Sequence, residues 1–230
     1  MTRLYMTVEG QTEQAFATQI LTPHLAAHDV FLTKPRLTGP ISRRKGRIPG
    51  GGLARFEVAL GDMKRWLKED QSPDARFTMM IDLYRLPNDF PKYGEAGRLD
   101  DPCGRVQFLE DTLSETIGDD RFIPYLQLFE FEAIVLSKPE AFAGQFEDCR
   151  PQTAKLKKLC REFASPEQIN DGPTTHPAAR ILALFPNYQK NLDGPQLAQD
   201  IGLPAIREEC PHFHQWLAKL ERLGGAQLES

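Results

Sequence analysis

The first residues of the chain alternate between apolar and polar positions, as a half-buried strand requires. Leu4, Met6 and Val8 are separated by more polar residues, and the pattern stops at Glu9 and Gly10. Because alternate side chains of a strand point to the same face, the three apolar residues would lie on one side of a sheet. We therefore predict a buried strand that ends at Glu9.

Later parts of the chain alternate between helical and strand-like patterns. A spacing of three or four between apolar residues predicts helices, and short apolar runs predict inner strands. The expected elements are a helix over 12–28, a strand at 30–32, a helix over 53–68, a strand over 76–82, a helix through 106–117 and a strand over 122–128. Thr12 should cap the first helix, and Pro23 should kink it or end it early.

The order of these elements predicts an α/β fold. Strands and helices alternate up to about residue 140, which favours βαβ units and a mainly parallel central sheet flanked by helices. Beyond Pro139 the chain has only helical patterns and turns rich in Pro and Gly. We expect an α/β core over 1–140 and a helical C-terminal extension over 141–230, packed together as one structural unit.

Composition excludes several classes of protein. The 230 residues are 40% hydrophobic and 26% charged, which argues against wholesale disorder. No apolar run approaches the ~18 residues of a membrane span. The four cysteines contain no C-x-x-C pair, and the N-terminus is too polar for a signal peptide, so we expect a cytoplasmic protein. The net charge of −4 argues against bulk electrostatic capture of nucleic acid.

One segment nevertheless carries a local excess of positive charge. Residues 30–56 contain seven Lys or Arg, five Gly and no acid. Arg43, Arg44, Lys45 and Arg47 lie closest together, and Gly residues let backbone N–H groups approach an anion. The segment could be a solvated surface or a loop that holds the phosphates of nucleic acid, and both interpretations remain open.

Acidic residues follow three of the predicted strands. Glu9, Asp82 and Glu130 stand at or just beyond strand ends, Glu13 comes four residues after Glu9, and Glu132 comes two after Glu130. Ligands of an open parallel sheet bind outside the carboxyl ends of its strands. We therefore predict that these carboxylates converge at one edge, although each of them alone could be an ordinary surface residue.

Converging carboxylates imply a neutralising cation or a shared proton, because like charges at close range repel each other. Oxygen ligands without nearby His or Cys suit a hard ion such as Mg²⁺ or Mn²⁺. Such an ion also bridges carboxylates to phosphate, and the basic segment would hold the flanking phosphates. Together the acids, the metal and the basic segment point to phosphodiester chemistry.

The segment Leu4–Glu13 resembles the first motif of the Toprim domain, in which a hydrophobic strand is followed by Glu, Gly and a helix. Topoisomerases, primases and the OLD (overcoming lysogenization defect) nucleases share that domain. The Glu-x-x-x-Glu spacing of Glu9 and Glu13 is most similar to the OLD branch. The resemblance implies a Toprim-like topology for the predicted sheet.

Further segments resemble an uncharacterised bacterial family that is catalogued as domain of unknown function 4276 and regarded as Toprim-like. These segments are MIDLYRLP at 80–87, YLQLFEFEA at 125–133, INDGP at 169–173, NLDGP at 191–195 and CPHFHQW at 210–216. The resemblance covers nearly the whole chain.

The Toprim resemblance implies roles for individual residues. Glu9 corresponds to the Toprim glutamate, a metal ligand or general acid and base, and Glu13 to the second glutamate of the OLD pattern. Asp82 corresponds to the first aspartate of the second motif, but Tyr84 stands where that motif has its second aspartate. Glu130 or Glu132 could replace the missing ligand, a single ion could bind tightly, or catalysis could be lost.

Two further expectations come from the resemblance. Small proteins of this kind are often encoded beside an ABC-type ATPase, and this chain has no G-x-x-x-x-G-K-[ST] loop of its own. Lys190 could stabilise the transition state at phosphorus, as a lysine does in OLD-like sites, or could simply lie at the surface.

The leading hypothesis is a Mg²⁺- or Mn²⁺-dependent nuclease that acts on DNA, in anti-phage defence with an ATPase partner. Glu9, Asp82 and one of Glu130 or Glu132 would hold the metal, and Glu13 would bind a second ion or orient the attacking water. The alternative is a non-catalytic subunit with a degenerate site that binds nucleic acid or the ATPase. An RNA-cleaving enzyme is a third possibility.

Overall fold

The computed structural model describes residues 1–38, 55–84, 86–169 and 172–225. Six strands form one sheet in which every pairing is parallel, with the order β2-β1-β4-β5, β3 added beside β1 and β6 beside β4. The strands are β1 (Thr2–Val8), β2 (Val30–Leu32), β3 (Arg36–Leu37), β4 (Ala75–Asp82), β5 (Phe122–Ile123) and β6 (Leu126–Gln127). The predicted α/β class with a mainly parallel sheet is confirmed.

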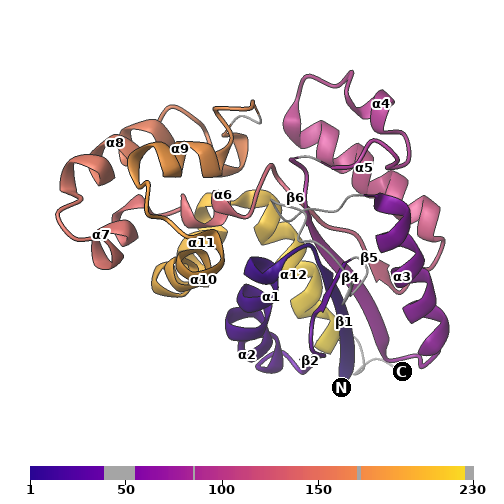
Figure 1. Ribbon diagram of the computed structural model, residues 1–230. Helices are drawn as coiled ribbons and strands as arrows, with labels where there is room; N and C mark the ends of the chain where they lie inside the picture. The colour runs from indigo at the N-terminus through magenta and orange to yellow at the C-terminus, as the bar shows by residue number, and fades with distance from the viewer. Residues whose placement is uncertain (39–54, 85, 170–171, 226–230) are drawn as a thin grey trace, which may run out of the picture.

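Helices cover both faces of the sheet (Figure 1). Leu4, Met6 and Met80 pack toward one face, whereas Phe77 and Met79 pack toward the other, as the alternation of side chains along a strand requires. The first face is covered by α1 (Gln11–Phe16), the π-helical turn η1 (Ala17–Leu21), α2 (Thr22–Ala26) and α12 (Pro211–Gly225). The second face is covered by α3 (Phe56–Glu69) and α5 (Pro102–Ile117).

The chain beyond Pro139 is helical, as predicted, and it extends from the first face of the sheet (Figure 1). The remaining helices are α4 (Tyr93–Ala96), α6 (Glu132–Val135), η2 (Pro139–Ala141), α7 (Phe142–Gln145), α8 (Arg150–Cys160), η3 (Pro166–Gln168), α9 (Pro177–Leu184), α10 (Lys190–Ile201) and α11 (Leu203–Glu209). None of the helices in the described ranges is both long and apolar enough to cross a membrane.

The last helix returns to the centre of the sheet. The Trp216 indole N–H of α12 donates a hydrogen bond of 3.0 Å to Thr78 Oγ1 on β4. The same indole ring stacks on Tyr125 with ring centroids 4.2 Å apart. One buried cluster therefore contains residues from β1 at one end of the chain and from α12 at the other.

The first helix differs from the prediction. It begins at Gln11 with Gly10 at the N-cap, so Thr12 lies within the helix and does not cap it. The helix is also not a single α-helix over 12–28, because the π-helical turn η1 interrupts it before Pro23. Pro23 has no N–H to donate to the preceding turn, and it sits in the first turn of α2, where that loss is tolerated.

Two strands also differ from the prediction. The expected strand over 122–128 is divided into β5 and β6 around Pro124, because proline cannot donate to a strand ladder. The short strand β3 was not predicted, since two exposed residues carry no alternating pattern. The prediction that 1–140 and 141–230 are distinct parts of one unit is left untested by this architecture.

Candidate functional site

Two of the predicted acids meet at the carboxyl edge of the sheet. β1 ends at Val8, one residue before Glu9, and β4 ends at Asp82. The Asp82 backbone N–H donates a hydrogen bond of 3.0 Å to Glu9 Oε2. Because β1 and β4 are adjacent and parallel, their ends share the edge where open α/β sheets bind ligands. The structure thus brings Glu9 and Asp82 together.

Glu13 is held at the same edge by the first turn of α1. Its Oε2 accepts a hydrogen bond of 2.8 Å from the Gly10 backbone N–H, and its side chain is buried. A Cβ atom on residue 10 would lie 2.9 Å from Glu13 Oε2, so a larger residue here would push the Glu13 carboxylate away from its present position. The strand, the tight turn and the helix start therefore fix Glu13 close to the end of β1.

Lys190, the first residue of α10, reaches into this group of acids. Its Nζ lies 2.9 Å from Glu132 Oε2 and 3.4 Å from Asp82 Oδ2. Asp82 Oδ1 accepts a 3.0 Å hydrogen bond from the Phe131 backbone N–H, so both carboxylate oxygens of Asp82 have partners. α10 packs against α1 and α6 to make this possible (Figure 1). We call Glu9, Glu13, Asp82, Glu132 and Lys190 the carboxylate–lysine cluster.

Burial shifts the protonation equilibria of this cluster. It raises the pKa of Asp82 well above its usual range, and the nearby Glu13 and Glu9 add to that rise while Lys190 opposes it. Burial also raises the pKa of Glu132, again against the effect of Lys190. For Lys190, burial works to lower the pKa, but the carboxylates of Asp82 and Glu132 outweigh it and raise the pKa. The carboxylates around Lys190 therefore favour its charged ammonium form.

Glu130 lies beside this cluster but binds other groups. Its Oε2 accepts a 3.0 Å hydrogen bond from the Ala178 backbone N–H at the start of α9 and lies 2.8 Å from His176 Nδ1. The Tyr84 ring stacks on the His176 ring with centroids 4.4 Å apart. Tyr84, for which the Toprim resemblance predicts an aspartate, thus contributes an aromatic face to His176.

His176 was not predicted to lie near the site. It follows the sequence Asp-Gly-Pro at 171–173, a combination that is typical of turns. The dipeptide His176-Pro177 is the sequence signal that could have identified His176 as a helix N-cap residue, because proline is favoured in the first turn of a helix. The order of the elements along the sequence does not predict that this N-cap residue lies beside Glu130.

The predicted metal ligands Glu9, Asp82, Glu130 and Glu132 supply the hard oxygen donors that Mg²⁺ and Mn²⁺ prefer. The side chains of the described ranges do not bring three of these oxygens within 4.8 Å of one another. Glu132 Oε2 is buried and makes no well-aligned hydrogen bond, although the Lys190 ammonium lies 2.9 Å away. The donor chemistry fits a divalent cation, which would compete with Lys190 for these oxygens.

The predicted nucleic-acid contacts Arg43, Arg44, Lys45 and Arg47 lie outside the described residues. Just before them in sequence, the chain lines a cavity of about 970 Å³ between β1, β3 and α3. Its walls include the cationic side chains Lys34, Arg36 and Arg65 and the aromatic rings of Tyr5 and Trp66. The Arg36 guanidinium lies over the Trp66 ring, 3.9 Å from its centroid.

Fold and site together define a class of protein: an α/β domain whose parallel sheet carries buried carboxylates and one lysine at its carboxyl edge. The chain belongs to the family described as "Domain of unknown function (DUF4276)", whose family model matches residues 8–221. Neither the curated proteins nor the solved structures gave a match. The predicted resemblance to this family is therefore confirmed, whereas the resemblance to the Toprim domain stays a prediction.

Proposed function

We propose that the chain is a divalent-cation-dependent nuclease that hydrolyses phosphodiester bonds of DNA. The observation that carries this proposal is the meeting of Glu9 and Asp82 at adjacent strand ends, with Lys190 Nζ 3.4 Å from Asp82 Oδ2. The carboxylates of Glu9 and Asp82 suit a hard cation. The Lys190 ammonium group beside them can donate to a phosphoryl oxygen. The edge of the sheet is also the expected ligand-binding edge of this fold class.

The residues divide the chemistry between them. Glu9, Asp82 and Glu132 would hold Mg²⁺ or Mn²⁺, which when bound lowers the pKa of water and neutralises phosphate charge. Lys190 would donate to a non-bridging phosphoryl oxygen as negative charge builds up in the transition state. Glu13, fixed by the Gly10 N–H, would orient the attacking water and accept its proton at the carboxylate.

A second basic region supports a nucleic-acid substrate. Lys34 and Arg36, which line the cavity beside β3 together with Arg65, belong to the same basic segment as Arg43, Arg44, Lys45 and Arg47. Contacts of this kind hold the backbone without reading its sequence. We propose DNA as the substrate on the resemblance to the OLD nucleases.

The same resemblance leads us to propose a partner. An ABC-type ATPase would supply the nucleotide-driven step that this chain lacks the P-loop to perform, and the pair would act in anti-phage defence.

A second candidate function is a non-catalytic subunit that binds nucleic acid or the ATPase. Two observations favour it. Lys190 already neutralises Asp82 and Glu132, and Tyr84 stacks on His176 where a second ligand aspartate is expected. In such a subunit the Lys190 ammonium group would take the place of a metal ion, so the fold would not need a bound cation.

Incubation of supercoiled plasmid with the purified chain and Mg²⁺ or Mn²⁺, with and without the ATPase, separates the two functions. We expect nicking that a chelator abolishes and that Glu9→Gln reduces at least ~100-fold, a loss of several kcal/mol of charge stabilisation. Glu140→Gln is the matched control, because Glu140 is a carboxylate of η2 that pairs with Lys157 away from the cluster. Retained DNA binding without any cleavage under all these conditions would instead support the non-catalytic subunit.

A further inference from the structure

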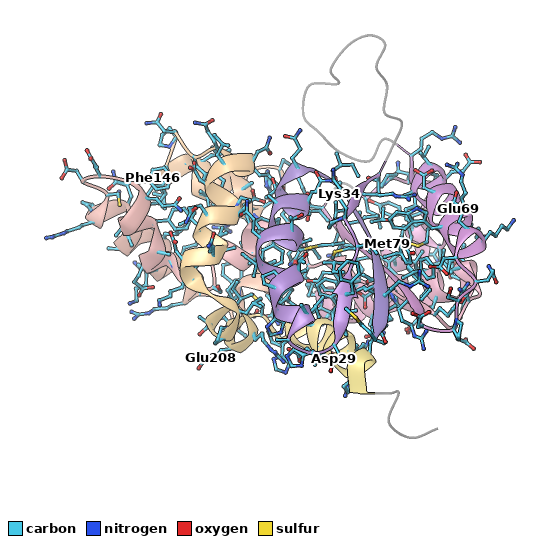
Figure 2. The ribbon with its side chains drawn as sticks, turned by 90° about the horizontal axis from the view of Figure 1, so that it is seen from below. Asp29, Lys34, Glu69, Met79, Phe146 and Glu208 are labelled. Carbon is cyan, nitrogen blue, oxygen red and sulfur yellow. The ribbon has the colours of Figure 1, made fainter. Side chains whose placement is uncertain are left out.

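A second group of polar side chains lies at the opposite edge of the sheet. His24 on α2, His28 in the turn before β2 and Glu221 on α12 bring one ligand atom each within 4.8 Å of one another. His24 Nε2 lies 2.7 Å and His28 Nε2 3.8 Å from Glu221 Oε1. Asp29, the residue after His28, marks this corner of the molecule in Figure 2. The proposed nuclease function uses none of these residues.

The backbones that carry these side chains are tightly fixed to one another. Thr2 Oγ1 donates a 2.8 Å hydrogen bond to the Leu223 carbonyl, which ties the end of α12 to β1. The Thr2 backbone N–H donates to the Asp29 carbonyl at 3.2 Å, which ties the turn to the same strand. A Cβ atom on residue 224 would lie 1.7 Å from the His28 carbonyl oxygen, so Gly224 permits direct contact between α12 and the turn.

We propose that His24, His28 and Glu221 form a binding site for a divalent transition metal, with Zn²⁺ as the reference ion. Two imidazole nitrogens, which are borderline donors, together with one carboxylate oxygen form a ligand set that favours Zn²⁺ over Mg²⁺. A tetrahedral ion with bonds of about 2.0–2.1 Å separates its ligand atoms by roughly 3.4 Å. The distances of 2.7 and 3.8 Å lie on either side of that value, so small side-chain movements suffice.

The exposure of the three side chains and the ion pair of Glu221 with Arg207 indicate a metal site at the protein surface. The His28 side chain is 42% exposed and that of Glu221 only 14%, so the ion would be held against the protein with its outer side open to water. Arg207 pairs with both oxygens of Glu221 and orients the carboxylate, as outer partners of metal ligands do. Each oxygen has two lone pairs, so Oε1 can accept from Arg207 and still face the histidines. The site would join α2 to α12 and stabilise the fold.

The experiment is a calorimetric titration of the full chain with Zn²⁺, combined with Co²⁺ absorption spectra and melting curves. We expect one strong site per chain, visible Co²⁺ bands typical of imidazole ligation, and a melting temperature that rises with zinc. His28→Ala and His24→Ala should each weaken zinc binding at least ~10-fold. His214→Ala is the control, because this exposed histidine contacts Arg207 Nε at 3.2 Å and is not one of the ligands.

Two further outcomes would overturn the proposal. One is zinc affinity that is unchanged in both His24→Ala and His28→Ala. The other is the absence of any heat or melting shift at ~100 µM zinc, a concentration at which a site of micromolar affinity would be stabilised by about 2.7 kcal/mol. Asp82→Asn should leave zinc binding intact, so the result is independent of whether the carboxylate–lysine cluster cleaves DNA.

Discussion

Lys190 controls the charge balance of the carboxylate–lysine cluster. It is the only basic side chain with a described ion pair to either Asp82 or Glu132, and both acids are buried. Removing one partner of a buried ion pair leaves an uncompensated charge, which is costlier than the pair itself is favourable. A cation supplied from solution can offset that loss, so Lys190 and a divalent ion should act as alternatives at this position.

Lys190→Met should therefore lower the free energy of unfolding by about 1–3 kcal/mol, less than for a fully buried pair because the Lys190 side chain is 36% exposed. Mg²⁺ at millimolar concentration should restore more stability to this variant than to the parent chain. Urea unfolding with and without Mg²⁺ measures both effects. Equal responses of the two proteins to Mg²⁺ would argue that no cation binds among these acids.

A second prediction at this scale concerns Asp70. Hydrogen bonds from the Tyr5 hydroxyl and from Ser72, with Arg3 nearby, lower the pKa of Asp70 to about 2. Because the folded pKa is depressed, this carboxylate stabilises the fold above its unfolded pKa of about 3.9, and the contribution is lost as pH falls from there through 2. Asp70→Asn should cost about 1 kcal/mol at pH 7 and flatten the acid limb of a stability–pH curve. An acid limb of unchanged slope would contradict this assignment.

At the scale of elements, the contact between α12 and β4 joins the end of the chain to its central strand. The hydrogen bond from Trp216 to Thr78 Oγ1 is buried on both sides. Trp66 on α3 offers a natural comparison, because its indole Nε1 is buried without a hydrogen-bond partner. The two tryptophans are similar in size and burial, but Trp66 lacks this hydrogen bond and instead carries the Arg36 guanidinium over its ring.

Trp216→Phe should destabilise the protein by about 1–1.5 kcal/mol more than Trp66→Phe does, since a buried hydrogen bond contributes roughly that much beyond the shared loss of volume. Denaturant midpoints and slopes of the two variants give the difference. If Trp66→Phe lowers the free energy of unfolding more than Trp216→Phe does, the hydrogen bond from Trp216 to Thr78 does not stabilise the packing of α12 on the sheet.

The elements also show what the sequence could and could not predict. The alternation at Leu4, Met6 and Val8 and the apolar run up to Asp82 predicted the strands, and parallel geometry alone then brings their carboxyl ends together. The contact between Lys190 and Asp82 spans 108 positions and the pair His24–Glu221 spans 197, and no periodicity of either partner encodes such distances. The π-helical turn η1 was missed because such turns are rare and the sequence ATQIL at 17–21 carries no signal for i→i+5 bonding.

At the scale of the whole molecule, the two ends of the chain share one core. Leu4 and Val8 of β1 lie in the same buried cluster as Phe213, Leu217 and Leu220 of α12. Removal of the segment 141–230 would therefore expose the apolar face of β1 and of the helices beside it, together with the acids that Lys190 neutralises. A cut of the chain near residue 140 would therefore pass through this core.

A chain of residues 1–140 should consequently fail to unfold cooperatively, even though it contains every strand of the sheet. We expect residual helix signal, binding of a hydrophobic dye and rapid proteolysis, compared with a single sharp transition for the full chain. Adding residues 141–230 as a separate polypeptide should restore protection from proteolysis, because the missing apolar faces of α12 would be supplied in trans. A cooperative transition of 1–140 alone at the melting temperature of the full chain would show that the sheet and its own helices suffice, and that the fold needs the C-terminal helices only to supply Lys190 to the carboxylate–lysine cluster.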